Sequence, residues 1–196
     1  MNRIEMPRRM RKTRRNRPQR GRGQTRSKAA TSWRLTEDGN IAPLRETYNG
    51  KPFFRKEYPW PIERAIANIL LANPHPNIVQ IYRIGPTYID MELLRPLAKK
   101  DLDPTQFQEA KRHLQSLSIA YMDWKMENVG LGADGLQKVY DFNMSGLYDV
   151  GSNVFKSEPM QGIQWKAATA KGYTRPTNMN NSAFHTFVGN VGNTNM

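Results

Sequence analysis

Two carboxylates and an amide stand in this sequence at a spacing that suits the transfer of a phosphoryl group. Asn128 follows Asp123 by five residues, and Asp141 follows Asn128 by thirteen. A phosphoryl-transfer site needs one carboxylate to orient the acceptor hydroxyl, and it needs a second carboxylate and an amide to hold magnesium on the phosphates. Asp123 would fill the first role, and Asn128 and Asp141 would be the magnesium ligands.

The segments around these residues resemble two motifs of the protein kinase family. Residues 121–128 are similar to the catalytic loop HRDLxxxN, with Tyr121 at its histidine position and Met122 at its arginine position. Residues 141–143 resemble the DFG turn, with asparagine in place of its glycine. The resemblance implies that Lys125 contacts a phosphate and that the family's activity is ATP-dependent phosphorylation of serine or threonine.

Further segments occur in the order that the kinase family requires. Residues 75–79, His-Pro-Asn-Ile-Val, resemble the run that leads into the fourth strand of the kinase small lobe, and residues 88–94 resemble its fifth strand and hinge. Residues 129–131 and 136–140 predict two strands, joined by a turn-rich segment that closes a hairpin. Four matches in family order favour kinase-like ancestry; the alternative is an unrelated α+β domain with a polar turn around Asp123.

The cation that would meet the phosphates of a nucleotide is less clearly marked. Residues 31–58 predict two short hairpins at the start of a small lobe, but the family's GxGxxGxV loop is missing, because only Gly39 and Gly50 occur there. Its absence removes the backbone donors that cover the phosphates. Lys56 is the candidate for the family's third-strand lysine, with Arg55 as its rival; a solvent-facing charge on an edge strand is the alternative.

A helix is predicted over residues 61–72, where four apolar side chains fall on one face: Ile62, Ile66, Ile69 and Leu70. In the family, this helix carries an acid that pairs with the third-strand lysine. That acid is expected nine residues before His75, where Ile66 stands. Glu63 is the only acid of the helix, and its simpler interpretation is a first-turn acid that complements the helix dipole.

The charge of the chain is concentrated in an arginine-rich arm. Residues 1–34 carry thirteen Lys or Arg and one acid, whereas the other 162 residues are nearly neutral, with 17 basic and 16 acidic side chains. We expect residues 1–30 to be disordered when free, because they bury too little apolar surface to offset their ordering entropy. The arm would bind nucleic acid or an acidic protein surface, with a nuclear address or a solvated tail as alternatives. The candidate contacts are Arg8, Arg9, Arg11, Lys12, Arg14, Arg15, Arg17, Arg20 and Arg22.

Little sequence remains for the helical lobe of a kinase. A helix is predicted over 103–118, but only about fifty residues follow the DFG-like turn, and residues 144–196 show no sustained 3.6-residue periodicity. We therefore predict an irregular, Asn- and Gly-rich extension over 144–196. The predicted fold is α+β: a kinase-like small lobe plus a remnant of the catalytic loop at 31–143, most of the helical large lobe missing, and extended N- and C-terminal arms.

Composition narrows the other possibilities. The chain has no cysteine and three histidines, so a disulfide framework is impossible and a zinc or iron site is not expected. No apolar stretch approaches the ~20 residues of a membrane span, and no signal-peptide core follows the basic start. We expect a soluble protein that is not secreted, and a virion, the nucleus and the cytoplasm all stay open as its location.

Together these observations favour a non-catalytic kinase-like module over an enzyme. Each departure from the family pattern removes a positioning part, and phosphoryl transfer depends almost wholly on positioning. The expected function is structural, as a component of a virion or nucleoprotein particle that attaches through its basic arm and needs no cofactor. The alternative is a minimal Ser/Thr protein kinase that uses Mg-ATP, with Asp123 and Lys125 in catalysis and Lys56, Asn128 and Asp141 in nucleotide and magnesium binding.

Overall fold

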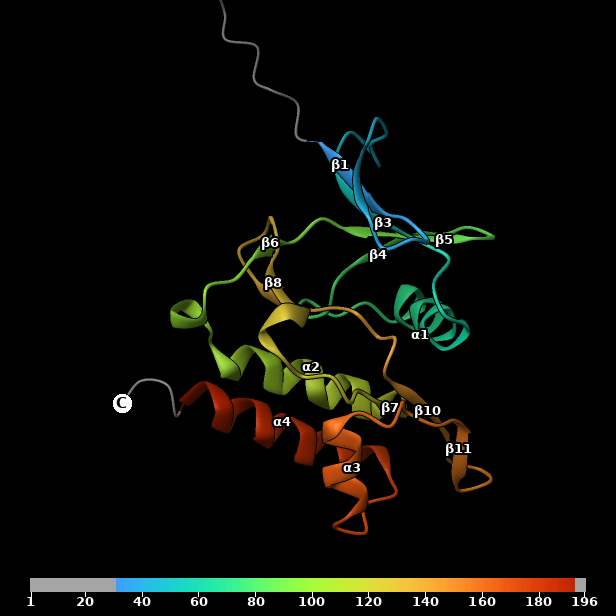
Figure 1. Ribbon diagram of the computed structural model, residues 1–196, viewed down its shortest axis with the longest axis vertical. Coiled ribbons are helices and arrows are strands. Elements are labelled where there is room, and N and C mark those ends of the chain that lie inside the picture. Colours follow the sequence, from blue (N-terminus) through green and yellow to red (C-terminus); the bar gives the residue numbers. More distant parts are fainter. Residues whose placement is uncertain (1–30, 193–196) are drawn as a thin grey trace, which may run out of the picture.

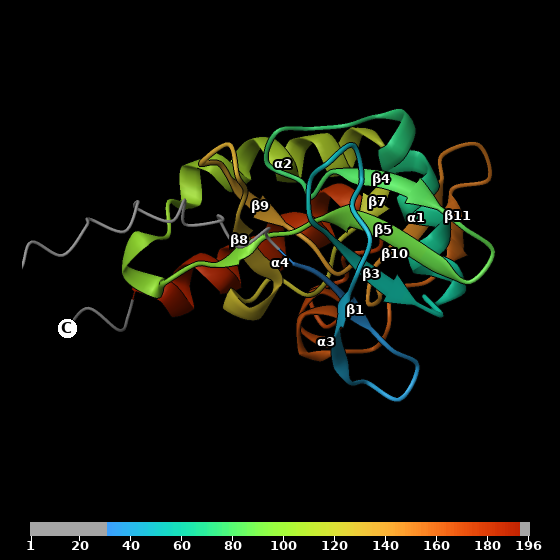
Figure 2. The ribbon, with the colours of Figure 1, turned by 90° about the horizontal axis from the view of Figure 1, so that it is seen from above.

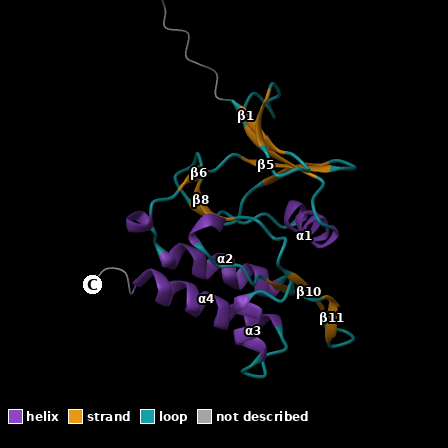
Figure 3. Cartoon of the chain, viewed as in Figure 1, coloured by secondary structure: helices purple, strands orange, loops and turns teal. Residues whose placement is uncertain are grey.

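The computed structural model describes residues 31–192 and divides them between a layer of strands and a group of helices (Figures 1 and 3). The layer of strands is a five-stranded sheet in the order β2-β1-β3-β5-β4. Its members are β1 (Ser32–Leu35), β2 (Ile41–Leu44), β3 (Phe53–Glu57), β4 (Ile81–Ile84) and β5 (Tyr88–Glu92). Seen from above, these strands lie over the helices (Figure 2). The predicted mixed α+β class is therefore confirmed.

β3 lies inside this sheet and carries the candidate lysine. It pairs in parallel with β1 and antiparallel with β5, so that Lys56 stands opposite Leu35 on one side and Ile89 on the other. β1 and β2 form an antiparallel hairpin whose turn contains Gly39, with a φ of +81° that suits glycine. The edge-strand alternative for Lys56 is wrong, because β1 folds back beside β3 and covers that edge.

α1 (Pro61–Ala72) lies beneath the sheet and against β4 (Figure 1). The chain enters it through an extended Trp60, and proline occupies the first turn, where its missing N–H costs no helical hydrogen bond. Ile66 and Leu70 are buried on its inner face. The predicted helix over 61–72 is confirmed.

Two small sheets join the main sheet to the helices. One has the order β6-β8-β9, built from β6 (Arg95–Pro96), β8 (Val129–Leu131) and β9 (Gln137–Val139). The other has the order β11-β10-β7, built from β7 (Ile119–Ala120), β10 (Gly146–Asp149) and β11 (Val154–Ser157). β8 and β9 are antiparallel neighbours, which confirms the predicted hairpin. Two short 3₁₀ turns complete this region, η1 (Lys99–Asp101) and η2 (Met126–Asn128).

Three helices form the lower part of the molecule: α2 (Pro104–Ser116), α3 (Ile163–Thr169) and α4 (Pro176–Gly192). The side chain of Asp103 caps α2 by accepting a hydrogen bond from the backbone N–H of Thr105 at 3.0 Å. The core between α2 and α4 is aromatic, with Trp124 in edge-to-face contact with Phe107 and Phe184. In the described part of the chain, no helix is long and apolar enough to cross a membrane.

The predicted irregular extension over 144–196 is wrong for its described part, which contains β10, β11, α3 and α4. α4 is rich in asparagine and has weak intrinsic helix propensity. One face nevertheless carries Met179, Ala183, Phe184 and Phe187, all of which are buried. Burial of that face against Trp124 and α2 stabilises a helix that propensity alone would not form. Residues 193–196 lie outside the described part.

Candidate functional site

A partly buried lysine bridges two carboxylates that are far apart in the sequence. Lys56 Nζ lies 2.7 Å from Glu63 Oε1 and 2.9 Å from Asp141 Oδ1. The lysine comes from β3, Glu63 from the first turn of α1, and Asp141 from the segment after β9. Their side chains are 15%, 4% and 27% exposed, so this ion triad closes off most of its charge from water. The arrangement holds the lysine ammonium in one place between the sheet and the hairpin.

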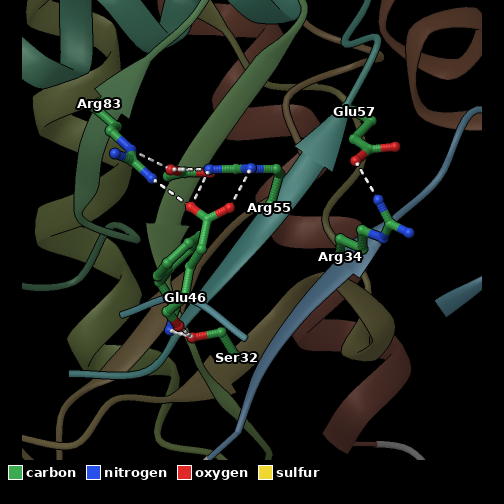
Figure 4. Close-up of polar contacts among 8 residues, drawn as sticks. Ser32, Arg34, Glu46, Arg55, Glu57 and Arg83 are labelled. Atoms are coloured by element: carbon green, nitrogen blue, oxygen red, sulfur yellow. Dashed lines mark hydrogen bonds and ion pairs between the residues drawn. The ribbon is translucent and has the colours of Figure 1, made fainter. Parts of the chain in front are cut away.

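Arg55, the rival of Lys56, faces the other side of the sheet. Successive strand side chains point to opposite faces, and Arg55 pairs there with the fully buried Asp90 at 2.7 Å. Figure 4 shows Arg55 and Arg83 converging on Glu46, each at 3.1 Å from Glu46 Oε2. Because Arg55 pairs with Asp90 and Glu46 on the outer face of the sheet, only Lys56 of the two reaches the inner face, where α1 lies.

Glu63 stands in the first turn of α1, as expected, but complementing the helix dipole is not its whole role. Glu63 is 3% exposed and pairs with Lys56. The spacing from His75 had pointed to Ile66, which is three residues further along α1 and on the same helical face. Ile66 fills the core, and the residue one turn earlier on that face supplies the carboxylate.

The electrostatics of the pair follow from its burial. Burial raises the pKa of Glu63, and the nearby ammonium of Lys56 offsets only part of that rise. For Lys56, burial disfavours the charged form, but Glu63 and Asp141 together more than offset it and hold its pKa above the usual value. Glu63 Oε2 has no hydrogen-bond partner in the described structure. Lys56 is therefore a cation at neutral pH, and the two carboxylates hold it in place.

The predicted catalytic loop forms a second polar cluster. Asp123 Oδ2 accepts a hydrogen bond from Asn128 Nδ2 at 2.7 Å and lies 2.7 Å from Lys125 Nζ. The Asn128 amide also donates to the backbone carbonyl of Asp123 at 3.0 Å, so it closes the loop twice. Asp123 is 14% exposed at its side chain. The structure therefore brings together Asp123, Lys125 and Asn128, as the spacing predicts.

Tyr121 connects this loop to the Asp141 segment. Its ring is fully buried, and its hydroxyl donates to the backbone carbonyl of Tyr140 at 2.8 Å. Burial raises the pKa of this hydroxyl well above its ordinary value, and the charges of Asp141 and Asp123 act in the same direction. Asp141 itself has a φ of +61°, a region that few residues other than glycine and asparagine or aspartate adopt. The tyrosine at the histidine position thus ties the two clusters together.

An apolar cavity of about 440 Å³ opens beside the two clusters. The sheet contributes Trp33, Ile41, Phe54 and Met91 to its lining, and the lower part contributes Met126, Val129 and Tyr140. Phe54 lies two residues before Lys56 on the same strand face, and Tyr140 immediately precedes Asp141. Two of the residues that line the cavity thus neighbour members of the ion triad in the sequence.

The turn between β1 and β2 departs from a phosphate-binding loop. Leu35 pairs with Lys56, so the turn starts just beyond the level of the lysine. It carries Glu37 and Asp38 where backbone donors would be needed. Hydrogen bonds from Thr36 and Asn40 lower the pKa of Asp38, which keeps this exposed acid charged. The turn therefore offers phosphates less stabilisation than a glycine-rich loop would.

Two amide side chains from the C-terminal helices hydrogen-bond to the backbone of residues 119–124, which lead into the predicted catalytic loop. Asn180 on α4 is fully buried, accepts from the backbone N–H of Tyr121 at 2.6 Å and donates to the carbonyl of Ile119 at 2.8 Å. Gln164 on α3 accepts from the N–H of Trp124 at 3.1 Å and donates to its carbonyl at 2.6 Å. Sequence reasoning missed both, because single amides in an Asn-rich segment carry no distinguishing pattern.

Replacing Asn180 with alanine should destabilise the fold by roughly 2–4 kcal/mol, because it leaves a buried N–H and a buried C=O without partners. The expected measurement is a lower midpoint of urea unfolding with an unchanged slope. Asn178, an exposed residue on the same helix, is the matched control. Equal midpoints for Asn178→Ala and Asn180→Ala would contradict the role given to Asn180.

The arm cations from Arg8 to Arg22, which are the predicted contacts for nucleic acid or an acidic partner, lie outside the described residues. Within residues 31–192, no group of three His, Cys, Asp or Glu side chains is arranged to bind a metal ion unaided.

In comparisons with known proteins, no protein-family model matches the chain and no curated protein matches it.

Proposed function

We propose that this protein is a small kinase-like phosphotransferase that uses Mg-ATP. The observation that carries the proposal is the partly buried Lys56, held between Glu63 and Asp141 beside an apolar cavity. Removing a lysine and its carboxylates from water costs desolvation energy, and apolar side chains in their place would often be as stable or more so. The arrangement resembles the lysine, helix acid and DFG aspartate of protein kinases, with Glu63 supplying the acid from one turn before the position that the spacing indicates.

Each part of the site has a role in the proposed reaction. The apolar cavity of about 440 Å³ would take the adenine ring, a volume within the usual range for ligand sites. Lys56 would neutralise the phosphates, with Glu63 fixing its direction. Lys125, which is 45% exposed and already beside Asp123, would contact the transferred phosphoryl group.

The chemical step would be carried by Asp123. Its carboxylate would accept the proton of a serine or threonine hydroxyl while the hydroxyl oxygen bonds to the γ-phosphorus of ATP. The bond between the γ-phosphorus and the bridging oxygen breaks, and ADP leaves. Asn128 holds the carboxylate in place through its 2.7 Å hydrogen bond.

The donor set suits magnesium, which prefers oxygen ligands. Asp141 offers a carboxylate, and Asn128 donates both of its hydrogen bonds through Nδ2, so its Oδ1 is the atom that an ion would meet. Magnesium bound there would neutralise charge on the phosphates. Its ligands would be two residues, with phosphate and water oxygens supplying the rest.

The proposal is tested by phosphoryl transfer from γ-labelled ATP to a mixed histone or casein acceptor, with and without magnesium. We expect slow, magnesium-dependent labelling that is lost in Asp141→Ala and retained in Asp149→Ala, a partly exposed acid of β10. Because the β1–β2 turn lacks glycine-rich donors, turnover well below the typical 1–100 s⁻¹ of kinases is expected. Labelling that persists in Asp141→Ala would point to a contaminant and refute the proposal.

A second candidate, the non-catalytic assembly component, is favoured by one observation. Thirteen Lys or Arg against one acid in residues 1–34 form an electrostatic arm that phosphotransfer does not need. In that case the arm would attach the chain to nucleic acid within a particle. The acids of the β1–β2 turn, Glu37 and Asp38, also fit a site that has lost nucleotide binding.

Salt-dependent binding of the full chain to a labelled single-stranded DNA oligonucleotide tests this role. Replacing six arm cations by glutamine should make the negative slope of log affinity against log salt shallower by about 4, because each phosphate contact on a single strand contributes about 0.7. The six are Arg8, Arg9, Arg11, Lys12, Arg14 and Arg15. An unchanged slope would exclude the arm as the nucleic-acid contact, and the transfer assay is independent of this result.

A further inference from the structure

Gln164 contacts the catalytic loop at the residue between its two functional side chains. Its amide accepts from the backbone N–H of Trp124 at 3.1 Å and donates to the carbonyl of the same residue at 2.6 Å. Trp124 stands directly between Asp123 and Lys125. One side chain from α3 thus satisfies both backbone groups of the residue that links the proposed base to the proposed phosphate contact.

This grip limits how the loop can move. The indole of Trp124 is buried against Phe107 and Phe184, so the residue is held by its ring on one side and by its backbone on the other. With the backbone fixed, the directions in which the neighbouring side chains leave the chain are also fixed. The fixed backbone thus keeps the side chains of Asp123 and Lys125 in the positions where they meet at 2.7 Å.

We propose that Gln164 is a positioning residue for Asp123 and Lys125, a role that rests on the proposed phosphotransfer. It acts through the backbone of Trp124 and has no contact with the nucleotide cavity, whose lining does not include α3. Loss of its two hydrogen bonds should therefore lower kcat and leave the KM for ATP unchanged. A misplacement of the base by about 1 Å can cost up to about a hundredfold in rate.

The test compares Gln164→Met, of similar length but without amide groups, with Gln161→Met at an exposed position just before α3. We expect a ten- to hundredfold lower kcat, an ATP KM within twofold, and at least tenfold faster hydrogen exchange at the Trp124 amide. Gln164→Glu keeps the acceptor for the Trp124 N–H, so the Trp124 amide should exchange more slowly in this variant than in Gln164→Met.

The outcomes separate this inference from the proposed function. If the wild-type protein transfers phosphate and Gln164→Met keeps the kcat of Gln161→Met, the positioning role is overturned. If the ATP KM rises together with a lower melting temperature, the residue is structural only and the inference is also overturned. If the wild-type protein transfers no phosphate, the proposed function fails. Equal hydrogen exchange at the Trp124 amide in Gln164→Met and wild type would show that the two hydrogen bonds from Gln164 do not hold this backbone.

Discussion

Replacing Asp123 with alanine should lower the rate of phosphoryl transfer by about 10²–10⁴-fold, the usual contribution of a positioned general base. Asp123 is held by Asn128 at 2.7 Å and paired with Lys125 at 2.7 Å, so its carboxylate is fixed in one position, and the proposed mechanism uses it there as the base. It does not line the apolar cavity. The affinity for Mg-ATP should therefore change by less than about twofold.

Asp101→Ala, at an exposed acid of η1, is the matched control and should transfer phosphate at the wild-type rate. Single-turnover kinetics with a saturating acceptor measure the chemical step directly. A rate for Asp123→Ala within threefold of wild type would remove Asp123 from the mechanism. A parallel loss of ATP binding would show that the loop has collapsed, and circular dichroism of the same sample would reveal it.

Replacing Lys56 with methionine should abolish detectable transfer, weaken Mg-ATP binding at least tenfold and destabilise the fold by about 3–5 kcal/mol, because it leaves Glu63 as an unpaired buried carboxylate. Lys56 is only 15% exposed and Glu63 4%, so solvent screens this pair little. Lys51→Met, at an exposed lysine just before β3, is the control for the loss of a positive charge.

The double variant Lys56→Met with Glu63→Met separates the two effects. It removes the orphaned carboxylate, so the free energy of unfolding should return to within about 1–2 kcal/mol of wild type while transfer stays abolished. Urea unfolding and γ-labelled ATP transfer measure the two quantities on the same preparations. Recovery of transfer together with stability would mean that Lys56 is a structural residue and nothing more.

Much of the site could be predicted from the sequence because its residues lie in short local patterns. Asp123, Lys125 and Asn128 fall within one loop, where spacing along the chain nearly fixes spacing in space. The hairpin over 129–140 places the Asp141 segment beside that loop, and turn residues mark it clearly. Lys56 was identified as a candidate, but its choice over Arg55 needed the alternation of the folded strand.

What the sequence could not supply depends on long-range packing. The pairing of Glu63 with Lys56 was missed because the two residues lie on different elements, and counting residues along the chain does not show which turn of α1 faces β3. α4 was missed because its asparagines interrupt the apolar pattern, and its apolar face is stabilised only by packing against Trp124 and α2. Its Asn180 is likewise indistinguishable from neighbouring asparagines until the loop is folded onto it.

The placement of β1 between β2 and β3 has a functional consequence of the same kind. Because β1 runs parallel to β3, the β1–β2 turn stands near Lys56 despite its lack of glycines at the family spacing. It brings the acids Glu37 and Asp38 to the end of the sheet where Lys56 lies. We therefore expect the site to depend more strongly on magnesium for phosphate neutralisation than a site with a glycine-rich loop.

Equilibrium binding of ATP to the purified full chain, by calorimetry with and without magnesium, tests the central claim most directly. A site built on Lys56, Glu63 and Asp141 beside the apolar cavity should bind Mg-ATP with a Kd below about 1 mM, the upper end of common enzyme affinities. Binding should weaken at least tenfold without magnesium and in Asp141→Ala. No heat of binding at millimolar Mg-ATP, from a folded sample, would contradict the account and leave the fold as a non-catalytic module.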